Sequence, residues 1–318
     1  MKRTDIGKLF AKREDKIRKL FIIYSLLFIA LIAVIFLSYH FINRNLHSKP
    51  SITMLYDKWE VYDYQSVYDI SSILLDKSPM NNTILTFRGY SSFYLAVSQN
   101  ENAMAQQLID ESIRCLRIAL LTAKKKTVAQ IDYMLGKAYF YKNELSSYGY
   151  YSDLTVYYLT AALEKGYKAD DVFEYLGLSY ALLGKTMESI AAFSEALLVR
   201  ESDSLLLSIA EQYYKAGITT ISKQYLYQLN TTSDNESLLL NSMNLLGKIY
   251  IDEGSYAEAQ KEYETILKKN ENSADAHYGL GVIYEKQNDI IKARSEWRKA
   301  LRIQVNHQEA LKKMAEYK

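Results

Sequence analysis

The chain has 318 residues, with 39 Lys or Arg against 37 Asp or Glu, and its formal net charge at pH 7 is +2. Eight of the basic residues lie in the first twenty positions, so the remainder carries a slight acidic excess. This balance argues against a nucleic-acid-binding protein, which would present a basic face. The single cysteine, Cys115, cannot form an internal disulfide, so the fold depends on the packing of a long chain.

The first predicted element is a transmembrane helix over residues 20–42, a stretch without Asp, Glu, Lys or Arg. As a helix it rises on the order of 30 Å, the thickness of the hydrocarbon core of a bilayer. Tyr24 and Tyr39 lie towards its ends, where amphipathic aromatic side chains favour the interface. A cleaved signal peptide is the alternative, but residues 36–40 offer no Ala-x-Ala-like cleavage site.

The flanks of this helix predict its orientation. Residues 1–19 form a basic leader and residues 43–50 a short linker, and only three basic residues follow the helix before position 60. Because basic residues favour the cytoplasmic side, we expect the N-terminus in the cytoplasm. The leader either lies along the inner leaflet or remains a solvated tail. Abundant Ile, Lys, Asn and Tyr are typical of AT-rich bacterial genomes, so we expect a single-pass protein of the cytoplasmic (inner) membrane whose larger part is periplasmic.

A repeated motif organises residues 51–318. Leu-Gly-x-x-Tyr occurs four times, beginning at Leu135, Leu176, Leu246 and Leu280, and the glycines of the last two copies are 34 residues apart. A fixed period of this size indicates stacked helical hairpins. Only two prolines occur in the chain, which suits a nearly all-helical fold.

The motif resembles the tetratricopeptide repeat, in which it lies on the first helix of a hairpin while a small residue and an aromatic residue lie on the second. The resemblance implies an all-α, right-handed solenoid of about six to seven hairpins that binds other proteins. Two helices approach closely only where side chains are small, and aromatic rings fill the space that remains. The residues at these structural positions are Gly136, Tyr139, Gly177, Tyr180, Phe193, Gly247, Tyr250, Ala259, Gly281, Tyr284, Ala293 and Trp297. The proline that often closes the motif is replaced by Glu201, Glu271 and Val305.

The spacing predicts the bounds of the units. We expect a closing helix at 308–318 with Leu311 and Met314 facing inward. The units before it are 51–80 (a partial unit), 81–127, 128–168, 170–203, 203–236, 240–273 and 274–307.

One unit is longer than the others. Gly136 and Gly177 are 41 residues apart, which is seven more than one period. We expect Tyr158 to be the second-helix aromatic residue and Ala161 the small one, so the excess lies between the two helices, at residues 144–153. Insertions in solenoids emerge as loops, so we expect a tyrosine-rich loop there.

The sequence contains no constellation typical of an enzyme or a metal site. Its four histidines pair neither with the cysteine nor with one another at helical spacing. Gly184-Lys185-Thr186 lacks the earlier glycine of a phosphate-binding loop, and no Gly-x-Ser-x-Gly elbow occurs. Asp170 and Asp171 begin a helix, where the macrodipole favours carboxylates. We therefore expect no enzymatic activity, no cofactor, no metal and no small-molecule substrate.

Side chains of the first helices are expected to line a concave groove that binds a partner. Tyrosine is favoured at interfaces because it combines a large contact area with a polar tip. We expect Phe140 and Tyr141 to be exposed beside the tyrosine-rich loop. Packing against the neighbouring hairpin is the alternative role for these rings. The candidate partner-binding residues are Tyr133, Lys137, Phe140, Tyr141, Tyr148, Tyr150, Tyr151, Leu178, Tyr214 and Lys248. Binding of chaperone C-terminal carboxylates is not supported, because the asparagine position of the family holds Lys137, Leu178, Glu211, Lys248 and Val282.

These observations predict a membrane-anchored scaffold for protein–protein interaction that assembles a bacterial envelope machine, such as a secretion apparatus, a pilus or a flagellar motor. The alternative is a chaperone-like accessory of protein export or outer-membrane assembly. In either case the expected partners are proteins and, through residues 20–42, the membrane. Nucleic acid is not expected as a partner.

Overall fold

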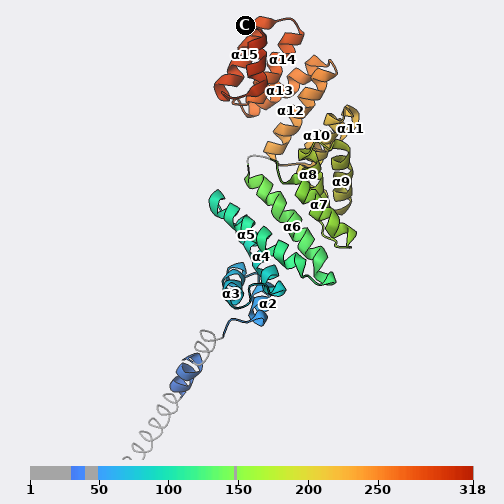
Figure 1. The fold of residues 1–318 in the computed structure, drawn as a ribbon. Helices are drawn as coiled ribbons and strands as arrows, with labels where there is room; N and C mark the ends of the chain where they lie inside the picture. Colours follow the sequence, from blue (N-terminus) through green and yellow to red (C-terminus); the bar gives the residue numbers. More distant parts are fainter. Residues whose placement is uncertain (1–29, 40–48, 147–148, 318) are drawn as a thin grey trace, which may run out of the picture. The chain divides into compact units, whose positions relative to one another are not determined.

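The computed structural model describes residues 30–39, 49–146 and 149–317. In these ranges the regular secondary structure is helical, without a strand (Figure 1). The chain divides into two compact units, residues 1–56 and 57–318, which are described separately. The helix α2 (Ile52–Glu60) contains the point of division.

In the first unit, residues 30–39 are helical. Among the helices that the structure describes, none combines the length and the apolar character needed to cross a bilayer. The predicted leader, the greater part of the predicted transmembrane helix and most of the predicted linker lie outside the described residues.

The second unit is a succession of helical hairpins. Each hairpin joins a first helix to a second helix, which pack along one another. The hairpins are α4 (Asn82–Val97) with α5 (Asn102–Leu121), α6 (Lys125–Leu145) with α7 (Ser152–Glu164), α8 (Val172–Leu182) with α9 (Thr186–Val199), α10 (Asp203–Lys215) with α11 (Thr219–Thr232), α12 (Glu236–Asp252) with α13 (Tyr256–Lys269), and α14 (Ala274–Lys286) with α15 (Ile290–Ile303). Before them comes α3 (Tyr64–Lys77), and after them α16 (Gln308–Glu316). This arrangement confirms the predicted all-α solenoid of helical repeats.

The first helices form one side of the repeats, which we call the inner face. Each first helix from α4 to α12 contacts the first helix of the next hairpin. Within the described residues, successive second helices do not contact one another to the same extent as successive first helices do. First helices are therefore closer to one another than second helices are, and their outward side chains share a continuous surface.

The repeat glycines make room for a large residue of the second helix. A Cβ added at Gly177 would lie 2.5 Å from Cε1 of Phe193, and one at Gly247 would lie 2.6 Å from Cζ of Tyr263. Gly281 has the same relation to Trp297. Since Phe193, Tyr263 and Trp297 are fully buried, each of these three hairpins is held by an aromatic ring that fills the space over a glycine.

The long third unit differs from its prediction in two respects. The residue over Gly136 is Leu159, so the second-helix position belongs to Leu159 and not to Tyr158. Tyr158 instead stacks on Tyr139, with 5.5 Å between the ring centroids. The predicted loop 144–153 is also too long, because α6 continues to Leu145 and α7 begins at Ser152. The inserted residues therefore extend a helix by about one turn and lengthen the loop by only a few residues.

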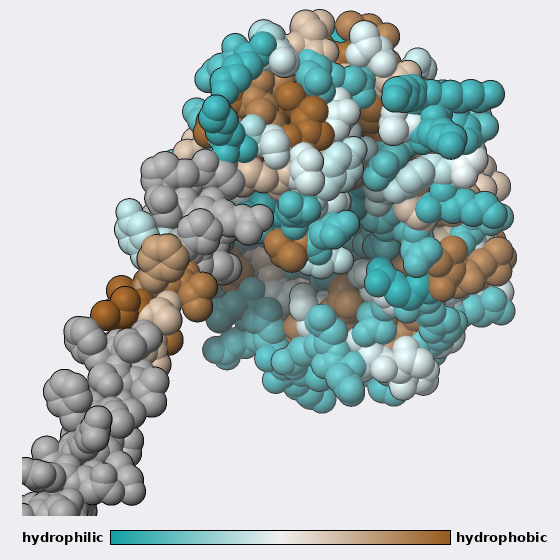
Figure 2. All heavy atoms as spheres, turned by 90° about the horizontal axis from the view of Figure 1, so that it is seen from below, coloured by the Kyte–Doolittle hydropathy of each residue, from teal (hydrophilic) through white to brown (hydrophobic). Residues whose placement is uncertain are grey.

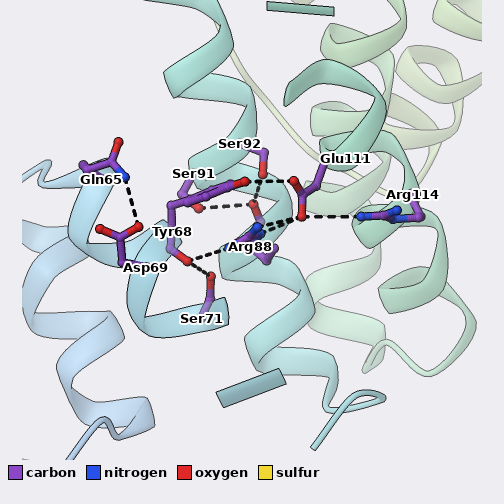
Figure 3. Close-up of polar contacts among 9 residues, drawn as sticks. All are labelled: Gln65, Tyr68, Asp69, Ser71, Arg88, Ser91, Ser92, Glu111 and Arg114. Atoms are coloured by element: carbon purple, nitrogen blue, oxygen red, sulfur yellow. Dashed lines mark hydrogen bonds and ion pairs between the residues drawn. The ribbon is translucent and has the colours of Figure 1, made fainter. Parts of the chain in front are cut away.

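A polar cluster joins α3 to the first hairpin (Figure 3). The buried guanidinium of Arg88 lies 3.3 Å from the centroid of the Tyr68 ring, and its Nε donates to Oε1 of Glu111 at 2.8 Å. The Tyr68 hydroxyl donates to the other carboxylate oxygen of Glu111 at 3.0 Å. The charge of Arg88 is thus paired and hydrogen-bonded, which is the condition for burying it.

The closing helix α16 covers the last hairpin in a way that the sequence did not predict. Leu311 is 42% exposed, whereas Ala310 is completely buried. The small residue permits close packing, and the ring of Tyr317 lies 5.7 Å from that of Trp297. Leu311 therefore does not face inward as expected, because α16 approaches α15 through Ala310.

Candidate functional site

The inner face of α6 is joined to the next hairpin by Tyr133 and Lys137. The Tyr133 hydroxyl donates to Oδ1 of Asp171 at 2.6 Å, and Nζ of Lys137 donates to Oδ2 of the same carboxylate at 2.8 Å. Burial and this hydrogen bond raise the pKa of Tyr133, so its hydroxyl remains a donor. Asp171 precedes the first residue of α8. Its role as an acceptor was not apparent from the sequence, where it only marked the start of a helix.

Lys137 lies among aromatic rings as well. Its ammonium nitrogen is 5.2 Å from the ring centroid of Tyr175, 5.3 Å from that of Tyr133 and 5.8 Å from that of Phe93. A cation over ring faces is attracted by their quadrupoles. Lys137 is therefore held by three rings and one carboxylate, all from within the repeats.

Phe140 and Tyr141, expected to form an exposed pair, have different environments. Phe140 is 9% exposed and packs edge-on against Tyr175 of α8, at 4.8 Å between the centroids. The expectation that Phe140 is exposed is wrong, because the neighbouring hairpin supplies an aromatic partner. Tyr141 is partly exposed, and its ring lies 5.3 Å from that of Phe93.

The tyrosines of the insertion also differ from one another. Tyr148 lies outside the described residues. Tyr150 is exposed, whereas Tyr151 is half-buried against Tyr139, with Nζ of Lys142 at 4.8 Å from its ring centroid. Among these residues the structure therefore places one tyrosine on the surface and one in the packing between α6 and α7.

A cavity of about 280 Å³ opens on the inner face between α6, α8 and α10. Leu178 lines it, together with Phe140, Leu182 and Glu211. Burial raises the pKa of the Glu211 carboxyl, while Lys215 and Lys248 act in the opposite direction. This cavity combines an apolar wall with a partly desolvated carboxylate.

A second cavity, of about 250 Å³, lies over α12 and α14. Tyr214 and Lys248 line it, as expected of inner-face residues. The Tyr214 hydroxyl donates to Oδ2 of Asp252 at 2.7 Å, and burial together with this bond raises the pKa of Tyr214 to about 12. Asp275 and Gly279 also line the cavity and were not singled out from the sequence. The sequence could have singled out Gly279, because this glycine lies outside the repeat positions.

Elsewhere the surface is mixed. The face in Figure 2 is mainly hydrophilic, with hydrophobic atoms gathered in separate patches. Leu198 of α9 is 81% exposed and lines neither of these cavities, whereas Leu182, 55% exposed, lines the first. Single exposed apolar residues are normal. Of these two leucines, Leu182 therefore is the one that combines exposure with a concave setting. Within the described ranges no group of three or more His, Cys, Asp or Glu side chains is placed to hold a metal ion.

Two family models match the last hairpins. A model described as "TPR repeat" matches residues 247–288, and one described as "Tetratricopeptide repeat" matches residues 274–307. Residues 247–307 are therefore tetratricopeptide repeats. The fold of the remaining hairpins continues the same arrangement of first and second helices.

Curated relatives share part of this chain. The ycf37 protein of Pyropia yezoensis is 36% identical over 77 residues, which are 24% of this chain and 43% of that protein. A TPR repeat-containing protein of Methanocaldococcus jannaschii is 30% identical over 178 residues, covering 53% of this chain and 30% of that protein. The chain thus spans less than half the length of either relative.

Solved structures show the same fold at low identity. The apo form of the quorum sensor NprR from B. thuringiensis aligns with a TM-score of 0.57 and 16% identity, over 86% of this chain and 80% of that one. The C-terminal part of a TPR repeat-containing protein from Cytophaga hutchinsonii aligns with a TM-score of 0.54 and 13% identity, over 83% of this chain and 99% of that one. At this identity the likeness concerns the fold alone.

Proposed function

We propose that this tetratricopeptide-repeat chain is a scaffold that binds a protein partner on the inner face of its hairpins. The observation that carries the proposal is the pair of cavities on that face, each lined by side chains from three or more helices. They contain apolar and aromatic side chains, which are enriched at the centres of protein interfaces, together with charged groups that can pair with groups of a partner. Side chains that only join hairpins, such as Tyr133, position these surfaces.

We further propose that residues 20–42 anchor the scaffold in a bacterial cytoplasmic membrane, with the hairpins in the periplasm, where it assembles an envelope machine. The support is the uncharged stretch 20–42 after a leader rich in Lys and Arg. A phosphatase fused after Lys318 should be active, and a fluorescent protein that folds only in the cytoplasm should remain dark. The reverse result would contradict the periplasmic location.

The binding surface is tested by a matched pair of substitutions in the full-length, detergent-solubilised protein. Leu182→Glu places a charge in the first cavity, whereas Leu198→Glu makes the same change on an exposed site outside both cavities. After a stoichiometric partner has been isolated, its affinity is titrated against both variants. We expect a loss of about 2 kcal/mol for Leu182→Glu, because a charge would replace an apolar contact at the interface, and no change for Leu198→Glu. Equal affinities would contradict the proposal, and capture of many unrelated clients would favour the chaperone-like alternative.

A further inference from the structure

The last part of the inner face contains a glycine that the repeat does not require. Gly279 lies two residues before the repeat glycine Gly281. A Cβ at Gly279 would lie 2.5 Å from Cε2 of Tyr263, and one at Gly247 would lie 2.6 Å from Cζ of the same ring. The ring of Tyr263, which belongs to a second helix, therefore lies between the first helices α12 and α14, against a glycine of each. Its tip reaches the inner face.

The hydroxyl of Tyr263 lies at the floor of the second cavity. The residue is 1% exposed and it lines the cavity, and its hydroxyl is not among the fully buried polar atoms without a partner, so this oxygen opens into the cavity. Burial raises the pKa of Tyr263, and the nearby Tyr214, Asp275, Tyr278 and Asp252 raise it further, so the hydroxyl stays protonated. A phenolic hydroxyl can both donate and accept a hydrogen bond. The cavity therefore holds a polar position that a bound group would satisfy.

The walls determine the charge of that group. Three carboxylates line the cavity: Asp252, Asp275 and Glu309. Asp252 is oriented by the Tyr214 hydroxyl at 2.7 Å, and Asp275 by Nε2 of His307 at 3.2 Å. The basic groups in the same lining are Lys248, which is exposed, and His307, whose ring lies beside Asp275 and Glu309. The cavity is therefore complementary to a cation.

Among cationic side chains, the guanidinium of arginine matches this lining best. Its planar fork offers five donors, enough to reach two carboxylates and a phenolic oxygen at once. It is also weakly hydrated and stacks on aromatic faces, which Tyr214 and Tyr278 supply. The ammonium of lysine is a point charge with a stronger hydration shell, so it loses more hydration on entering the cavity.

We propose that the cavity over α12 and α14 is a specificity pocket for an arginine side chain of the partner, with the Tyr263 hydroxyl at its floor and Asp252 and Asp275 on its walls. The proposal rests on the proposed function, since the arginine belongs to a protein that occupies the inner face. It adds that the partner segment at this end of the repeats is basic.

The test uses full-length protein in nonionic detergent and fluorescent peptide pools with random neutral residues around one fixed position. That position is arginine, lysine or citrulline, which has the shape of arginine without its charge. Binding is followed by fluorescence anisotropy. Tyr263→Phe removes only the hydroxyl and keeps the ring between the glycines, and Asp275→Asn neutralises one wall. Tyr256→Phe, on the same helix but outside the cavity, is the matched control.

We expect the arginine pool to bind about tenfold more tightly than the citrulline pool, as one charge-assisted hydrogen bond suffices for such a ratio. Tyr263→Phe and Asp275→Asn should each remove most of this preference without changing the melting temperature, and Tyr256→Phe should leave it intact. Equal binding of arginine and citrulline pools would overturn the arginine pocket while leaving peptide binding on the inner face standing. If none of the pools binds, the arginine pocket is contradicted as well. That result would not decide whether the inner face binds a partner, which the titration of Leu182→Glu tests separately.

Discussion

Single side chains hold three of the hairpins together through a pairing of a glycine with an aromatic ring. Gly177 of α8 faces Phe193, Gly247 of α12 faces Tyr263 and Gly281 of α14 faces Trp297, each ring on the following second helix. The sequence pattern indicated which residues are structural because both members recur at a fixed spacing. It could not indicate Phe140 as a buried residue, since the ring that covers it, Tyr175, lies outside the repeat positions.

The first prediction for a single residue concerns the substitution Gly177→Ala. The added methyl group would lie 2.5 Å from Cε1 of Phe193, whose ring is fully buried and cannot move aside. Overpacking of this kind costs about 1–3 kcal/mol, which outweighs the gain of about 1 kcal/mol in helix propensity. Gly149→Ala is the control, because the nearest atom to its Cβ is 4.0 Å away. Denaturant unfolding should show a lower free energy of unfolding for Gly177→Ala only, and equal values would contradict the packing.

The polar cluster of Figure 3 gives a second prediction. Glu111→Gln leaves the buried guanidinium of Arg88 without its counter-charge. Loss of one partner of a fully buried pair lowers the free energy of unfolding by about 3–5 kcal/mol. We expect a smaller loss for Glu111→Gln, because Glu111 retains some exposure. Arg114→Ala, which removes an exposed cation from the same carboxylate, should cost no more than about 0.5 kcal/mol. Thermal unfolding of both variants measures the difference. A larger effect from Arg114→Ala would contradict the assignment of the buried pair.

A third prediction concerns alkaline pH. The pKa of Tyr214 is raised to about 12 in the folded protein by burial and by its bond to Asp252, whereas an unfolded tyrosine has a pKa of about 10. The folded state therefore holds this proton more tightly, and the resulting stability is complete below about pH 10 and is lost as the pH rises through about 12. The free energy of unfolding should fall over this range, less steeply in Tyr214→Phe. Parallel curves for the two proteins would contradict a raised pKa.

At the scale of helices, the glycine spacing predicted the hairpins but not how an insertion is distributed. The distance from Gly136 to Gly177 reports only a total length, and the structure divides the excess between a longer α6 and a slightly longer loop. Tyr158 and Leu159 are adjacent large residues, so composition alone could not tell which of them faces Gly136. The orientation of α16 was equally ambiguous, because Ala310 and Leu311 are neighbours and close packing selects the smaller one.

For helices, we predict that the closing helix α16 shields Trp297 from water. Trp297 is fully buried, and Tyr317 and Ala310 lie in the cluster that encloses it. Terminal helices shield the last repeat of a solenoid from water. Deletion of residues 307–318 should therefore shift the fluorescence of Trp297 to longer wavelength, measured in a Trp59→Phe background because the chain has two tryptophans. The control Leu311→Ala, at an exposed site, should leave the emission unchanged. An unshifted spectrum after deletion would show that α16 does not cover Trp297.

For the molecule as a whole, the sequence predicted the class of fold but not the binding surface. Repeat spacing determines which helices pair, and the structure confirms a solenoid. The inner face depends on contacts between residues that lie some thirty or more positions apart, such as Tyr214 with Asp252, and on an additional glycine, Gly279, that the periodic pattern does not explain. Cavities of this kind arise from the packing of three helices, so they cannot be read from the residues of one.

The central claim, that the inner face binds the partner, is tested most directly by hydrogen exchange of the full-length protein with and without its isolated partner. Binding slows exchange at the amides it covers and at the helices it stabilises. We expect added protection to be concentrated in the first helices α6, α8, α10, α12 and α14, and the second helices α9, α11 and α13 to change little. Protection concentrated in the second helices, with the first helices unchanged, would contradict it.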